Sequence, residues 1–329
     1  MIPKIDSEIG ILFYATKSAG CGGIIRKENK DFFVSEIISK KIHFDTSSDS
    51  GYTVYKLKKN GIDTTHALSD IFQRYGIRLK SLGLKDASAV TEQFVFTTTK
   101  RKQCFEINES KYSLKKIGIV DKQLSKKEMI GNHFKIKIDG ASNELYKFEE
   151  YDKILNFYGY QRFGSRRPVT HLIGRSLIKK NFANAIELLL SFTSKYDKPE
   201  NTALREMMAD KSNYNDALKI IPGSMDLEKI ALKEMIEHGN PVAAIRNLPL
   251  SIRRFFVQSY QSYIFNRTLS MAFENGEELF IPQTGDVCYD KHSNLGKFEN
   301  DPLQRLSIPF VGYSYYKTTR FNYYIEKIL

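Results

Sequence analysis

Residues 81–99 read SLGLKDASAVTEQFVFTTT, and this stretch indicates how the first half of the chain folds. The run from 93 to 99 is rich in β-branched and aromatic residues, which favour a strand. Asp86 comes shortly before that strand, so we expect it in a loop that rigid structure holds in place. Catalytic groups often lie in such loops.

The pair Lys85-Asp86 allows two interpretations. A carboxylate beside a positive charge can attack an electrophilic carbon and form a covalent intermediate. Aspartates in loops also cap helices and hold turns through hydrogen bonds from the side chain to the backbone. On spacing alone, the structural role of Asp86 is favoured over catalysis.

The first half of the chain is predicted to form a sheet with one helix. Apolar and polar residues alternate over 134–138, and Asp139-Gly140 ends that strand. Thr65 is expected to cap a helix that closes near Gly76 and has one apolar face. The residues on that face are Leu68, Ile71, Phe72 and Tyr75. An α+β sheet domain is therefore expected.

The second half is predicted to be mainly helical, because its apolar residues recur at helical spacing. Breakers at 221–223 and 239–241 separate the helices, and 282–302 is expected to be loop or short strands. The change of pattern predicts two domains, residues 1–164 and 165–329. The helical faces are Ala183, Ile186, Leu189 and Leu190; Leu227, Ile230, Ala231 and Met235; and Phe256, Tyr260, Tyr263 and Ile264.

The charge of the chain points to a polyanionic partner. The 329 residues include 50 Lys and Arg against 38 Asp and Glu, a net charge of +12, with 19 Tyr and 22 Phe. Phosphate contacts and aromatic stacking are what a nucleic-acid binder needs, although basic clusters can also be solvated faces. Nucleic acid is therefore the predicted partner. The clusters are Lys100-Arg101-Lys102, Lys126-Lys127, Arg166-Arg167, Lys179-Lys180 and Arg253-Arg254.

The composition argues against several other classes of protein. With 41% apolar and 27% charged residues, the chain has the balance of a folded, soluble protein. No window approaches the ~18 apolar residues of a membrane span, so the cytoplasm is expected. Cys21, Cys104 and Cys288 are too scattered for a disulfide framework, and neither a metal-ligand spacing nor a phosphate-binding glycine motif occurs. No metal and no small-molecule cofactor are expected.

A second stretch, NFYGYQRFG at 156–164, has neither a helical nor a strand period. Its aromatic side chains could stack an extruded base, its amides could read the edge of that base, and its glycines allow close approach of RNA. An aromatic corner that packs one domain on the other explains the stretch about equally well.

Three separated motifs together resemble those of the TruD family of pseudouridine synthases. The family pattern G-x-K-D-x-x-A-V-T-x-Q is complete at 83–93, N-x-x-G-x-Q-R-F-G matches 156–164, and D-F-x-V-x-E matches 31–36. The likeness covers nearly the whole chain. It also includes Asn60-Gly61, Thr64, 131–134, 170–174 and 260–266.

The resemblance implies a catalytic α+β domain with a mixed or antiparallel sheet (1–164) and a mainly helical inserted TRUD domain (165–329). It implies Asp86 as the nucleophile and Arg26 as the basic partner that orients its carboxylate, with Lys85 as a second candidate for that role. A shared role would require the fold to bring these motifs to one basic cleft. The implied substrate-binding residues are Phe32, Asn156, Tyr158, Arg162 and Phe163.

The substrates implied by the resemblance are RNAs, above all the uridine at position 13 of transfer RNA, and the reaction uses no cofactor. A monomer is expected. The chain departs from the family at Asn29-Lys30, where Pro-Glu is usual. No segment like F-x-L-P-x-G-S-Y-A-T precedes Leu329, so the strand that returns to the catalytic sheet is expected to be absent. This departure leaves an alternative, an RNA-binding protein without catalysis.

Overall fold

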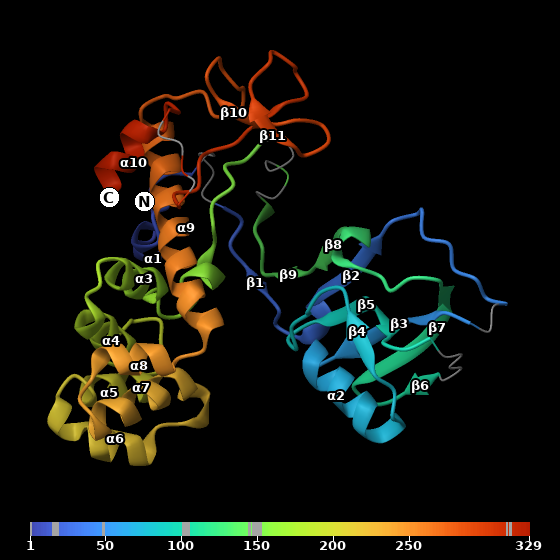
Figure 1. Ribbon diagram of the computed structural model, residues 1–329, viewed down its shortest axis with the longest axis horizontal. Helices are drawn as coiled ribbons and strands as arrows, with labels where there is room; N and C mark the ends of the chain where they lie inside the picture. Colours follow the sequence, from blue (N-terminus) through green and yellow to red (C-terminus); the bar gives the residue numbers. More distant parts are fainter. Residues whose placement is uncertain are drawn as a thin grey trace. The chain divides into compact units, whose positions relative to one another are not determined.

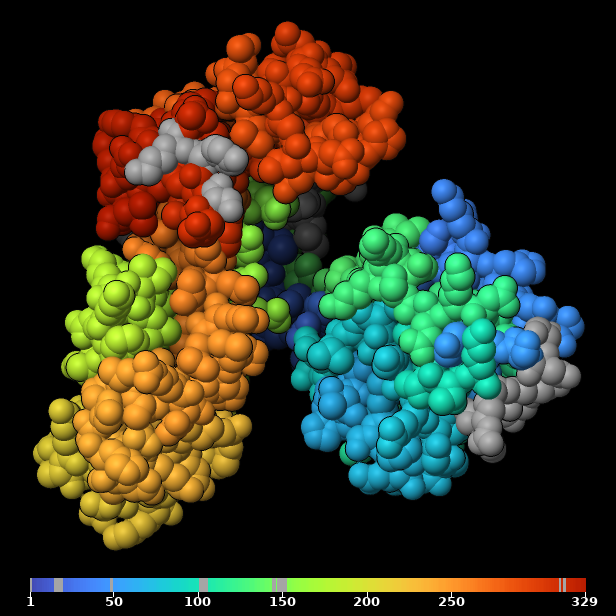
Figure 2. Space-filling model, viewed as in Figure 1, coloured from blue at the N-terminus to red at the C-terminus, as the bar shows by residue number. Residues whose placement is uncertain are grey.

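The chain forms two compact units. The sheet unit comprises Ser18–Tyr151, and the helical unit comprises Met1–Lys17 together with Asp152–Leu329. In the space-filling view the colours follow the sequence, so residues 50–100 are blue to cyan and residues 200–329 are yellow to red (Figure 2). The predicted α+β class is confirmed. The computed structural model (Figure 1) describes residues 2–14, 20–47, 50–100, 106–143, 146, 153–313, 315 and 318–329.

The sheet unit is built on a mixed sheet whose described strands follow the order β6-β7-β3-β5-β2-β8, with β4 also paired to β5. Strands β2 and β5 are parallel, and the other neighbours are antiparallel. A short separate pair joins β1 (Ile24–Ile25) to β9 (Ile138–Asp139). The strands of the main sheet are β2 (Phe32–Ile38), β3 (Tyr52–Asn60), β4 (Leu79–Ser81), β5 (Val90–Thr97), β6 (Ile107–Asn108), β7 (Tyr112–Val120) and β8 (Met129–Ile136), and the short 3₁₀ turns are η1 (Asn29–Asp31) and η2 (Lys126–Glu128).

The strands predicted at 93–99 and 134–138 are confirmed as β5 and as the end of β8 with β9. The predicted helix is α2 (Thr64–Tyr75), which packs on the sheet through Ala67 and Ile71. Its cap is Asp63 rather than Thr65, because the Asp63 carboxylate accepts a hydrogen bond from the main-chain nitrogen of His66.

The apolar face of α2 is narrower than predicted. Phe72 and Tyr75 are 41% and 37% exposed, although both were expected on the buried side. Gly76 ends the helix with a φ of +68°, the left-handed conformation that glycine adopts without strain.

The helical unit is organised around the long helix α9 (Leu250–Glu274), against which α3 (Thr170–Ile178) packs closely. The helices predicted from the three apolar faces are confirmed, and β10 and β11 are short strands within 282–302 as predicted. The remaining elements are α1 (Lys4–Glu8), η4 (Tyr160–Arg162), α4 (Phe182–Ser191), α5 (Pro199–Met207), η5 (Lys211–Asn213), α6 (Tyr214–Ile220), η6 (Gly223–Met225), α7 (Asp226–Glu237), α8 (Pro241–Asn247), β10 (Val287–Tyr289), β11 (Leu295–Lys297), β12 (Arg305–Leu306) and α10 (Asn322–Ile328).

The boundaries of the two units differ from those of the two predicted domains, which were 1–164 and 165–329. The fully buried amide of Asn266 explains much of the difference. It donates to the carbonyls of Ile9 and Tyr158 at 2.9 and 3.0 Å and accepts from the Tyr158 nitrogen at 2.9 Å. These bonds tie the N-terminus and the segment after residue 153 to α9. The roles of the units as catalytic and inserted domains stay a prediction.

Other predicted features concern cysteines and membranes. Cys21 and Cys288 are free thiols, whereas Cys104, Arg101 and Lys102 lie outside the described residues. Within the described part of the chain, no helix has the length and apolar character needed to cross a membrane.

Gly174 lies at a close approach of α3 and α9, and it gives a test of this packing. A Cβ at Gly174 would lie 2.0 Å from the carbonyl oxygen of Phe256, so the helices would have to move apart. We expect Gly174→Ala to lower the free energy of unfolding by roughly 2 kcal/mol or more. Gly223→Ala, with open space at the Cβ position, is the matched control and should change it little. Equal unfolding curves for both variants would contradict the packing described.

Candidate active site

A buried lysine of β3 holds the loop that carries Asp86. Lys59 ends the inward-facing series of β3 and is 1% exposed. Its ammonium donates to the main-chain carbonyls of Ile62, Lys85 and Asp86 at 2.8, 3.0 and 2.8 Å. Burial lowers the pKa of Lys59 to about 8, while the carboxylates of Asp63 and Asp86 act in the opposite direction. One side chain thus joins the turn before α2 to the Asp86 loop.

Two polar side chains complete this attachment. The Thr64 hydroxyl accepts from the Lys85 nitrogen at 2.9 Å and donates to the Gln93 side chain at 2.8 Å. Gln93 in turn donates to the Gly83 carbonyl at 3.1 Å. Both Thr64 and Gln93 are 1% exposed. Because buried hydrogen bonds are costly to break, the backbone over 83–86 has a defined position.

The contacts of Lys85 argue against its predicted role of orienting Asp86. Its ammonium lies 2.9 Å from the Glu36 carboxylate, and both side chains are largely buried. Glu36 also accepts from the Phe94 nitrogen at 2.8 Å. Lys85 therefore ties the loop to β2 and β5, and the geometry favours Arg26 as the basic partner of Asp86.

The Asp86 carboxylate is on the accessible side of this loop. It is 67% exposed, and its Oδ2 lies 3.9 Å from Nη2 of Arg26. The guanidinium carbon of Arg26 is 3.9 Å from the centroid of the Phe32 ring, a cation–π arrangement. Arg26, Phe32 and Asp86 therefore lie together in the sheet unit.

Arg26 has two features that are unusual for a surface arginine. Its φ is +60°, a left-handed conformation that costs a non-glycine residue of order 1 kcal/mol or more. Its Nε is buried without a hydrogen-bond partner among the described residues. Phe32 is only 9% exposed and has Arg26 on one face, so Arg26 and not the ring provides most of the accessible surface of this pair.

The other predicted binding residues belong to the helical unit. Asn156 is exposed and Tyr158 half-buried. The guanidinium of Arg162 lies between two rings, 5.4 Å from the centroid of Tyr158 and 5.5 Å from that of Phe255. Tyr158, Arg162 and Phe255 are among the walls of an open hollow of about 590 Å³ along 158–165.

Phe163 does not support its predicted role in RNA binding. Its side chain is fully buried and contacts His171 edge-to-face, with 5.4 Å between the ring centroids. A ring without accessible surface cannot stack a base, so Phe163 contributes to the core of the helical unit. Whether the remaining predicted residues act at one cleft stays a prediction.

Comparison with known proteins gives consistent matches. Residues 8–306 match the family model described as "tRNA pseudouridine synthase D (TruD)". The chain is 32% identical over 311 residues to a "Probable tRNA pseudouridine synthase D" of Methanosarcina mazei, covering 89% of this chain and 70% of that protein. A protein of the same description from Nanoarchaeum equitans is 32% identical over 278 residues, covering 82% and 69%.

A solved structure is similar as well. It is described as the "Crystal Structure of the Putative tRNA pseudouridine synthase D (TruD) from Methanosarcina mazei", with a TM-score of 0.75 and 27% identity over 92% of this chain and 74% of that one. The chain belongs to the TruD family. The resemblance found in the three motifs is therefore confirmed, and the reaction class of this family is the isomerisation of uridine to pseudouridine.

Several residues of the TruD motifs have a structural role in holding the loop that carries Asp86. Gly83, Lys85 and Gln93 of the aspartate motif, together with Thr64 and Glu36, hold the backbone that carries Asp86. Lys59 was not among the residues predicted from the sequence to contribute to the site. The sequence did contain an indication, because Tyr55, Leu57 and Lys59 alternate along β3, which places a charged residue at an inward position.

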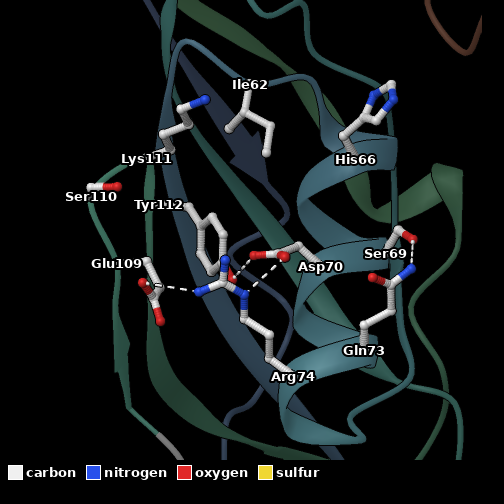
Figure 3. A pocket seen from close by; sticks show the side chains of 10 residues that line it. All are labelled: Ile62, His66, Ser69, Asp70, Gln73, Arg74, Glu109, Ser110, Lys111 and Tyr112. Atoms are coloured by element: carbon white, nitrogen blue, oxygen red, sulfur yellow. Dashed lines mark hydrogen bonds and ion pairs between the residues drawn. The ribbon is translucent and has the colours of Figure 1, made fainter.

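A hollow in the sheet unit is a poorer candidate site. It has a volume of about 420 Å³ and lies between α2 and residues 109–112 (Figure 3). Three of its charged groups pair with one another: Asp70 accepts from Arg74 at 2.9 Å and from the Tyr112 hydroxyl at 2.6 Å, and Arg74 is 3.5 Å from Glu109. Such a closed network leaves few groups for a ligand.

Lys59 gives a test of how the loop is held. Lys59→Met fills similar space but removes the donor to three main-chain carbonyls. We expect the free energy of unfolding to fall by roughly 2–4 kcal/mol. We also expect kcat for pseudouridine formation to fall while KM changes little, because the position of the Asp86 loop changes. Lys58→Met, at an exposed position of the same strand, is the control. Wild-type kcat in a folded Lys59→Met variant would contradict the role assigned to this ammonium.

Proposed function

We propose that this chain isomerises uridine to pseudouridine in transfer RNA, with the Asp86 carboxylate as the nucleophile. One observation carries the proposal: the carboxylate is exposed and has an arginine at 3.9 Å, while its main chain is fixed by Lys59. A nucleophile must be accessible, yet held within a narrow range of positions.

The reaction requires the bond between sugar C1′ and base N1 to break and a bond between C1′ and base C5 to form. The proton of C5 is lost and N1 gains one, so the product is an isomer of the substrate. Attack of Asp86 on C1′ or on C6 of the base would keep the fragments together until the base has turned. In this proposal Arg26 orients the carboxylate by electrostatic attraction.

RNA binding is proposed for residues of both units. Phe32 and Arg26 offer a cation beside an aromatic ring, and Tyr158 and Arg162 form a similar pair in the helical unit. Such pairs suit an unstacked base and its phosphates. Asn156 has an exposed amide, which could read a base edge. Action at position 13 of transfer RNA, a cytoplasmic location and a monomeric state belong to this proposal.

The charge of Asp86 can be removed without a change of size. We expect Asp86→Asn to reduce pseudouridine formation by roughly 10³-fold or more, because an amide is a far weaker nucleophile, and to leave the affinity for transfer RNA within a few-fold of wild type. The measurement is release of tritium from RNA labelled at C5 of uridine, alongside filter binding of the same RNA. Asp121→Asn, at an exposed position of the same unit, is the control and should keep full activity.

Two outcomes would count against the proposal. Tritium release at the wild-type rate by Asp86→Asn would require another nucleophile. A wild-type chain that binds transfer RNA but releases no tritium would favour the alternative, an RNA-binding protein without catalysis.

A further inference from the structure

We propose that an aromatic cavity of the helical unit binds a second, unstacked nucleobase of the RNA substrate. This inference rests on the proposed function, since it takes RNA as the substrate. The cavity has a volume of about 400 Å³, within the range of roughly 300–1,000 Å³ that is typical of small-molecule sites. It is lined by residues before η4, on α9 and on β10 and β11, and by residues 307–310, 315 and 319.

Aromatic rings dominate the walls of this cavity. Tyr158 meets Phe265 edge-to-face, with 5.4 Å between the ring centroids, and lies 6.0 Å from Phe310. Tyr289 and Phe310 are 40% and 41% exposed. Tyr315 lines the cavity too. Exposed rings around a hollow cost hydrophobic free energy in the unbound protein, and they are what a single-stranded nucleic acid uses for stacking.

A polar group without a partner also lies in this wall. Thr319 lines the cavity and is 6% exposed. Its hydroxyl has no hydrogen-bond partner among the described residues. An apolar occupant would leave this hydroxyl unpaired, whereas the edge of a base carries donors and acceptors.

Cations share the sheet face that lines the cavity. Strands β11, β10 and β12 form a three-stranded antiparallel sheet in that order. In its register, Val287 is opposite Lys297, and Tyr289 is opposite Arg305. Residues directly opposite in an antiparallel pair lie on the same face. Val287 and Tyr289 line the cavity, and Lys297 and Arg305 are exposed. The positive charges therefore stand beside the aromatic wall, where the phosphates of an inserted nucleotide would lie.

The cavity also adjoins the motif segment. Tyr158 lines both this cavity and the hollow along 158–165 that contains Arg162. Tyr158 is therefore shared by the two hollows. The charges at Lys297 and Arg305 favour a nucleotide over an apolar peptide segment as the occupant.

The absence of tryptophan from the chain allows a direct test. Phe310→Trp places a single fluorophore at the mouth of the cavity, and Tyr323→Trp places one on α10, at a 58% exposed position outside it. Each variant is titrated with unmodified transfer RNA, with labelled RNA anisotropy as the independent measure of binding. We expect a stacked base to quench the fluorescence of the Phe310→Trp variant along the binding curve and to leave the control nearly unchanged. Inorganic polyphosphate, which has charges but no bases, should not quench either variant.

A second variant gives an affinity readout. Tyr289→Ala should weaken transfer RNA binding by roughly five- to a hundredfold, the effect of losing one base–aromatic stack, while Tyr323→Ala should not. RNA that binds and is isomerised without quenching the Phe310→Trp variant would overturn the cavity proposal and leave the proposed function intact. Equal quenching by polyphosphate would overturn the assignment of a base. Absence of any RNA binding by the wild-type chain would overturn both proposals.

Discussion

The candidate active site depends on the hydrogen bonds that the buried ammonium of Lys59 donates. This ammonium satisfies three main-chain carbonyls that come from the turn before α2 and from the Asp86 loop. Without that donor, the carbonyls of Ile62 and Asp86 would lose this hydrogen bond, whereas the Lys85 carbonyl would still accept from the Thr64 nitrogen at 3.2 Å. The loop and the turn before α2 would then lose their shared attachment to the Lys59 side chain of β3. The cost of burying the charge appears as the lowered pKa of Lys59. The resulting loop fixes the backbone of Asp86 and leaves its carboxylate exposed.

A similar arrangement organises the helical unit. The buried amide of Asn266 holds the main chain of Tyr158 and the carbonyl of Ile9, so an irregular segment is fixed by a side chain of α9. The ring of Tyr158 remains beside Arg162 and Phe310. In both units, buried polar groups hold irregular backbone and leave reactive or aromatic side chains accessible, which is a common property of functional loops on rigid scaffolds.

Sequence patterns predicted the regular elements better than the contacts between distant residues. Apolar periodicity located α2, α4, α7 and α9, and a run of β-branched and aromatic residues located β5, because both signals are local. The cap at Asp63 and the exposure of Phe72 depend on tertiary packing, which no window of sequence contains. The roles predicted for Asp86 and Arg26 come from the family resemblance and stay predictions. The burial of Phe163 and the contact of Lys85 with Glu36 could not be predicted from local sequence, because both depend on packing partners elsewhere in the chain.

The central claim is that Asp86 forms the covalent bond that holds the substrate during isomerisation. The most direct measurement is to incubate the wild-type chain with transfer RNA in which 5-fluorouridine replaces uridine, since fluorine at C5 cannot leave as a proton. Mass spectrometry of the digested complex then locates any nucleotide that remains attached to the protein. The account predicts attachment at Asp86 and none in Asp86→Asn. A stable adduct at any other residue would contradict it.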